Sequence, residues 1–104
     1  MKINDMFLYL PIAAIIKSQK DTILCMHGGI GRSASAKEAV ERVEALKRPI
    51  TVIMDSSGTE DHAIVRDFLW SDPSKNEEGV LPSSRDGFAG HIKNFGPDRV
   101  ATFL

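Results

Sequence analysis

Apolar and polar positions divide the chain into short blocks, and the first blocks predict a helix end followed by a hairpin. Residues 3–10 are predicted as the end of a helix, because Pro11 disfavours the helical conformation of the residue before it. Two apolar runs follow, residues 12–16 and 22–26, with a polar link of five residues between them. This pattern predicts a β-hairpin. Since both runs are almost continuously apolar, we expect both faces of the hairpin to be covered.

A second block has helical spacing. Ser35 and Glu38 fit a capping box, in which a hydroxyl begins the helix and a carboxylate follows three residues later. The helix is expected to end at Arg48 and Pro49, because proline breaks a helix interior. Its predicted apolar stripe consists of Ala36, Val40, Val43 and Leu46.

The last third of the chain predicts two more helices and a strand. Thr59 can cap a helix that runs to Pro73, with two acidic residues in its first turn. Residues 74–90 are rich in glycine, proline and serine and are predicted to be a loop, whereas residues 91–95 favour a strand. A helix with proline in its first position should begin at residues 96–98. The predicted apolar side of the first of these helices consists of Ala63, Ile64, Phe68 and Leu69.

Composition limits the possible functions. The chain has 104 residues, which suits one domain or a piece of one, with 42% hydrophobic residues and a net charge of −1. Interleaved acids and bases argue against a nucleic-acid groove and a polybasic membrane anchor. The longest apolar run, residues 10–16, is far shorter than the about 20 residues that span a bilayer. From the charge pattern and the short apolar runs we expect no nucleic-acid or membrane partner. A single cysteine indicates a reducing compartment, so we expect the cytoplasm or nucleus.

The candidate chemistry lies directly after the second apolar run, where His27 precedes Gly28, Gly29 and Gly31. Imidazole is a common metal ligand, but zinc sites take three or four protein ligands, so a hydrogen-bonded structural histidine is the alternative. The glycines suit either an anion-binding nest or a tight strand-to-helix turn. The two other histidines, His62 and His91, are expected to be exposed to solvent.

Several other residues have both a functional and a purely structural interpretation. Cys25 and Arg32 resemble the loop of a cysteine-dependent phosphatase, but six residues separate them instead of five, so Cys25 is expected to pack as a small buried apolar residue. From residue type alone, Trp70 would be a core anchor, Asp72 a turn residue and Arg85 a surface arginine.

Taken together, four short motifs resemble the metal-dependent serine/threonine phosphoprotein phosphatases. They are ILCMHGG at residues 23–29, KRP at 47–49, FLWSDP at 68–73 and FGPDRV at 95–100. The segment YLPIAA at residues 9–14 is also similar to the stretch that precedes the histidine motif in that family. The variants GIGRS at residues 29–33 and FGPDRV are similar to the branch that carries Kelch repeats.

The resemblance implies an α/β fold, the metallophosphoesterase fold, in which helices flank a central β-sandwich. It also implies two divalent metal ions of the Mn, Fe or Zn type, which activate water for in-line attack on phosphoserine or phosphothreonine without a covalent intermediate. By motif match, His27 would be a ligand of one metal. Asp72 and Trp70 would support the loop that faces the substrate, and Arg85 would grip a phosphate oxygen.

This sequence departs from the family pattern, because two aspartate motifs and an Asn-His-Glu motif that provide most metal ligands are not found in it. We therefore expect residues 1–104 to be the C-terminal portion of a phosphatase catalytic domain, truncated at both ends, that retains neither metal nor activity by itself. Phosphoprotein substrates and a regulatory or Kelch-repeat partner are the expected partners. The alternatives are a non-catalytic phosphatase-like binding module and, with less support, a cysteine-dependent phosphatase.

Overall fold

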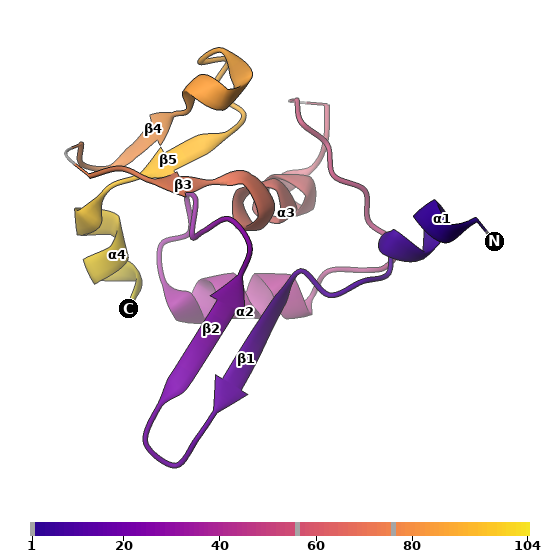
Figure 1. Ribbon diagram of the computed structural model, residues 1–104, viewed down its shortest axis with the longest axis horizontal. Helices are drawn as coiled ribbons and strands as arrows, with labels where there is room; N and C mark the ends of the chain where they lie inside the picture. The colour runs from indigo at the N-terminus through magenta and orange to yellow at the C-terminus, as the bar shows by residue number, and fades with distance from the viewer. Residues whose placement is uncertain (1, 56, 76) are drawn as a thin grey trace.

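The computed structural model describes residues 2–55, 57–75 and 77–104, which form a flat molecule of 45 × 43 × 19 Å (Figure 1). It combines helices with two separate small sheets, so the predicted α/β class is confirmed. The elements are α1 (Ile3–Phe7), β1 (Ala13–Lys17), β2 (Thr22–Met26), α2 (Ala36–Glu44), α3 (Glu60–Trp70), β3 (Asp72–Pro73), β4 (Val80–Pro82), the 3-10 helix η1 (Ser84–Asp86), β5 (Lys93–Phe95) and α4 (Pro97–Phe103). The sandwich that the resemblance implies remains a prediction.

The hairpin is present where the sequence predicts it, and its tip extends beyond the helices (Figure 1). Strands β1 and β2 pair antiparallel, and the Ser18 hydroxyl closes the turn by accepting a hydrogen bond of 3.0 Å from the Asp21 amide. The expectation that both faces are covered is wrong, since the cross-strand partners Ile16 and Ile23 are 56% and 55% exposed. One face of the hairpin is turned toward α2, and the described residues leave the other uncovered.

Helix α2 confirms the predicted capping box, because the Ser35 hydroxyl accepts a hydrogen bond of 3.2 Å from the Glu38 amide. The helix ends at Glu44, earlier than the predicted end at Arg48 and Pro49. Ala39, which the predicted stripe omits, is the buried residue of α2, whereas Val40 lines the space beneath the hairpin.

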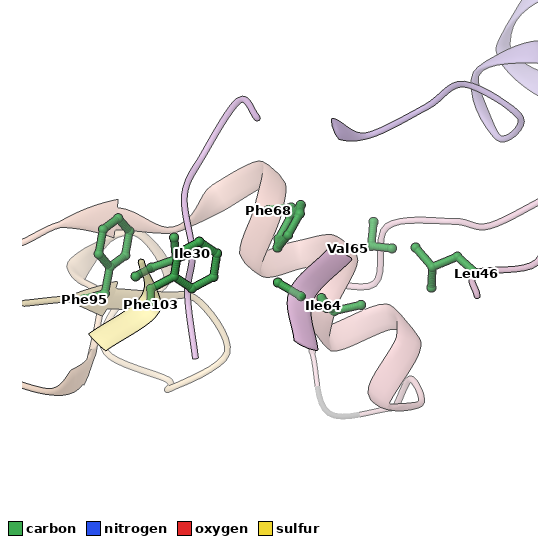
Figure 2. Close-up of a cluster of buried hydrophobic side chains, with 8 residues drawn as sticks. Ile30, Leu46, Ile64, Val65, Phe68, Phe95 and Phe103 are labelled. Atoms are coloured by element: carbon green, nitrogen blue, oxygen red, sulfur yellow. The ribbon is translucent and has the colours of Figure 1, made fainter. Parts of the chain in front are cut away.

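Helix α3 provides the centre of the core (Figure 2). Ile64 and Phe68 are buried as the sequence predicts, and Val65 is buried beside them. The other residues of the buried cluster come from segments that surround α3. Because these segments pack against α3, the helix positions residues of several loops. The other members of the cluster are Ile30, Ala39, Leu46, Phe95 and Phe103.

The second sheet has the strand order β3-β5-β4, with β3 parallel and β4 antiparallel to β5. The predicted strand within residues 91–95 and the helix that begins at Pro97 are confirmed. The prediction of a plain loop over residues 74–90 is wrong, since β4 and η1 lie in this segment. Both are only three residues long, too short to show a period among prolines and glycines. Among the described residues, no helix has the length and apolar character needed to cross a membrane.

Candidate functional site

His27 follows β2 directly, and the backbone of the next residue fixes its place against the end of α3. The Gly28 amide donates a hydrogen bond of 2.7 Å to the carbonyl oxygen of Phe68. A Cβ at residue 28 would lie 2.7 Å from the backbone nitrogen of Trp70, so a side chain there has no room. The glycine therefore allows β2 to approach α3 closely enough to bring His27 beside Trp70.

The glycines after His27 form a tight turn. Gly31 has a φ of +53°, and a Cβ there would overlap the side chain of Asp67. Its amide donates a hydrogen bond of 3.1 Å to the Ser71 hydroxyl, and the Arg32 amide donates one of 3.1 Å to the Asp67 carboxylate. Because these amides are already bonded within the protein, the turn interpretation is confirmed in preference to an anion nest.

A pocket of about 460 Å³ brings together the residues that the resemblance singles out, and it is lined by His27, Leu69, Trp70 and Arg85. Trp70 is 40% exposed, so the expectation of a core anchor is wrong. Residues two positions apart lie on nearly opposite sides of a helix, so burial of Phe68 turns Trp70 away from the core. His27 is exposed at the same pocket, so its imidazole is accessible.

Arg85 is held over Trp70 by three interactions. Its Cζ lies 5.4 Å from the centroid of the indole ring, a cation–π distance. Its Nη1 donates a hydrogen bond of 3.4 Å to the Trp70 carbonyl oxygen, and its Nε lies 3.4 Å from Oδ2 of Asp72. The structure thus brings Arg85, Asp72 and His27 to one region, with Asp72 reaching the pocket through Arg85.

The loop that carries Arg85 is closed by Asp86, which sequence reasoning missed. One carboxylate oxygen of Asp86 accepts hydrogen bonds of 3.0 and 2.9 Å from the amides of His91 and Ile92. The bond from the Ile92 amide is the main reason that the pKa of Asp86 lies below its usual value, and the bond from His91 lowers it further against the opposing effect of desolvation. Aspartate near serine and glycine, as in residues 83–87, is typical of turns, and this pattern was the available sequence signal for Asp86.

Two buried charged residues of α3 bind the neighbouring loops, and the sequence analysis did not predict them. Asp67 forms a two-bond ion pair with Arg32, at 2.7 Å to Nε and 3.0 Å to Nη2. Arg66 donates hydrogen bonds to the carbonyl oxygens of Ile53 at 2.6 Å, Asp55 at 3.0 Å and His91 at 2.8 Å. The available sequence signal was the position of these two charged residues inside the apolar run of α3. Buried charges need partners, so this position indicates contacts with other segments.

Two further expectations about side-chain exposure are wrong. Cys25 is exposed, because in β2 it alternates with Leu24 and Met26, which lie on the partly buried face. His62 and His91 are half-buried instead of exposed. The Nδ1 atom of His62 accepts a hydrogen bond of 3.0 Å from the Thr59 amide and so helps to begin α3.

Among the residues that line the pocket, the imidazole of His27 is the one side chain suited to bind a metal ion. Within residues 2–55, 57–75 and 77–104, no group of three or more His, Cys, Asp or Glu side chains is arranged to hold a metal. The accessible ring of His27 suits a single ligand position, but the described residues do not form a ligand set.

Comparison with known proteins finds similarity to a serine/threonine-protein phosphatase. No family model matches the chain. Over 98% of its length the chain is 42% identical to the serine/threonine-protein phosphatase BSL2 of Arabidopsis thaliana, and it spans 9% of the length of that protein. The predicted resemblance is confirmed: the chain is similar to one segment of a serine/threonine-protein phosphatase.

Proposed function

We propose that residues 1–104 form the C-terminal portion of a serine/threonine phosphatase catalytic domain, of the branch that carries Kelch repeats. The complete domain hydrolyses phosphoserine and phosphothreonine in proteins of the cytoplasm or nucleus, with a regulatory or Kelch-repeat partner. The likeness to BSL2 supports the family. The observation that carries the site is the pocket in which His27, Trp70 and Arg85 meet from three separate parts of the chain.

In this proposal each residue has a distinct task. His27 contributes one ligand to a pair of divalent metal ions of the Mn, Fe or Zn type, which lower the pKa of bound water when present in a complete domain. Arg85 has a planar guanidinium that suits the oxygens of a phosphate group. Asp72 and Trp70 contact Arg85 and orient it.

We expect the isolated 104-residue chain to hydrolyse no phosphoprotein. A single imidazole supplies only a small part of the about 10–16 kcal/mol that a complete structural zinc site provides. The measurement is phosphate release from a phosphothreonine peptide by the purified chain in the presence of Mn²⁺. Release no faster than in a protein-free control is expected, and metal-dependent turnover would show that the chain holds a working site.

The role of His27 can be tested without activity, by adding Mn²⁺ in small steps and recording the imidazole proton signals by NMR. Mn²⁺ is paramagnetic and broadens the signals of the ring that it binds. The His27 signals should broaden first, while the half-buried His62 and His91 serve as internal controls in the same sample. Equal broadening of all three rings would remove His27 as the preferred ligand.

A non-catalytic binding module is the second candidate, and the lack of a ligand set among the described residues favours it. It predicts saturable binding of a phosphopeptide to the isolated chain when metal is removed with a chelator. The cysteine-dependent mechanism has less support, because the Arg32 guanidinium is bonded to Asp67. Thiol-sensitive hydrolysis that is lost in Cys25→Ser would establish that mechanism instead.

A further inference from the structure

We propose that Asp72 competes with phosphate for Arg85. The Asp72 carboxylate holds the guanidinium folded over Trp70, and a phosphate group binds by replacing that carboxylate. This inference rests on the proposed role of Arg85 in phosphate binding and adds a control on it.

The contacts define one closed position for Arg85. Its Nε faces Oδ2 of Asp72 at 3.4 Å, its Nη1 reaches the Trp70 carbonyl oxygen at 3.4 Å, and its Cζ lies 5.4 Å from the indole centroid. The Nε edge of the guanidinium, which would take part in two-bond binding of a phosphate, already faces an internal anion. In this position Arg85 cannot offer that edge to a ligand.

The ion pair is weak enough to exchange. The side chains of Arg85 and Asp72 are 48% and 46% exposed, so water screens their attraction, and ion pairs of this kind contribute little to stability. A phosphate group carries more charge than a carboxylate and has more acceptor oxygens, so it can displace Asp72 from the guanidinium.

The exchange needs only side-chain rotation, because the backbone on both sides of Arg85 is fixed. The Arg85 amide donates a hydrogen bond of 3.1 Å to the Ser83 hydroxyl, and Asp86 binds the amides of His91 and Ile92. The loop can therefore stay in place while the guanidinium turns from Asp72 toward a ligand in the pocket.

Competition and simple support give opposite results for Asp72→Asn. If Asp72 only supports the pocket, removing its charge should weaken phosphate binding. If Asp72 competes, the same change should strengthen binding by about two- to five-fold, which is the strength of an exposed ion pair. The sign of the change decides between the two roles.

Trp70 provides the readout, because it is the only tryptophan of the chain and lies beneath Arg85. Inorganic phosphate is titrated into the 104-residue chain at constant ionic strength while tryptophan fluorescence is recorded. We expect Asp72→Asn to bind two- to five-fold more tightly than the unchanged chain, and Arg85→Met to lose the response. The matched control is Asp61→Asn, a carboxylate-to-amide change nine residues before Trp70 on α3 and about 13.5 Å from it along the helix axis.

Three other outcomes overturn the inference, and they separate it from the proposed function. Equal or weaker binding by Asp72→Asn, with the response still lost in Arg85→Met, rejects competition but keeps Arg85 as the phosphate ligand. An unchanged response in Arg85→Met rejects the role of Arg85 and the inference with it. Phosphate that changes the fluorescence of neither the unchanged chain nor Asp72→Asn also rejects both the role of Arg85 and the inference.

Discussion

At the scale of single residues, Asp67 connects more of the site than its place in the sequence suggests. Its carboxylate is almost completely buried, at 1% exposure of the side chain, and it accepts bonds from the side chain and the amide of Arg32. Its carbonyl oxygen accepts a hydrogen bond of 2.6 Å from the Ser71 hydroxyl. The turn that follows His27 is therefore fixed to α3 mainly through this one residue.

Replacing Asp67 with alanine should lower the free energy of unfolding by about 3 kcal/mol. We expect the lower end of the range for a broken buried pair, because the Arg32 side chain is 40% exposed and can turn toward water. Urea unfolding followed by circular dichroism measures the change. Glu41→Ala, on the exposed side of α2, should stay within about 0.5 kcal/mol, and an equal loss in both variants would contradict the role of Asp67.

The motif residues were easier to predict than the residues that hold them. His27 and Trp70 lie in short sequence motifs, the family resemblance adds Arg85, and the structure brings all three to one pocket. The partners of Asp67 and Arg66 could not be predicted, because they are a guanidinium and carbonyl oxygens that lie far away in the sequence. Helical spacing assigns a residue to a face of the helix, but it does not show which loop will cover that face.

At the scale of elements, the segment from Ser83 to Ile92 is a loop in which the Asp86 carboxylate binds the amides of His91 and Ile92, and its stability should depend on pH. The pKa of Asp86 in the folded chain lies below its usual value, chiefly because the Ile92 amide donates a hydrogen bond to it. The unfolded chain therefore binds this proton more readily than the folded chain. The stabilisation is complete above the usual value of 3.8 and is lost as the pH falls through the lower, folded value.

We therefore expect Asp86→Asn to be less stable than the unchanged chain at neutral pH, with the difference shrinking as the pH falls below about 4. Unfolding by urea at a series of pH values measures this, and the amide signals of His91 and Ile92 report on the loop locally. Glu41→Gln is the matched carboxylate-to-amide control. A difference between Asp86→Asn and the unchanged chain that does not vary with pH would rule out the proposed linkage.

The sequence predicted most elements because their signals are local. A capping hydroxyl at Ser35, the polar link of the hairpin and Pro97 each act within a few residues. Strand β4 escaped prediction because its existence depends on pairing with β5, which lies more than ten residues away. The exposure of the hairpin depends on which parts of the molecule pack against it, so an apolar run alone led to the wrong expectation.

At the scale of the whole molecule, the described chain leaves much apolar side-chain surface open to water. The hairpin contributes Ile15, Ile16 and Ile23, and its sheet contains only two strands among the described residues. An apolar strand edge of this kind pairs readily with another chain. Strand β1 carries no proline and only one charged residue, at its end, so it lacks the usual protection of an edge strand.

The isolated chain should therefore self-associate as its concentration rises, through the open face of the hairpin. Ile16 and Ile23 are cross-strand partners, so the double change Ile16→Lys with Ile23→Glu removes the apolar pair and introduces opposite charges at neighbouring positions. We expect sedimentation velocity to show less association for this variant, while the buried core and the thermal midpoint change little. Exchanging two charges at the hairpin tip, Lys20→Glu with Asp21→Lys, also preserves net charge but should leave association unchanged. A monomeric unchanged chain across the whole concentration range would show that the exposed isoleucines do not drive association.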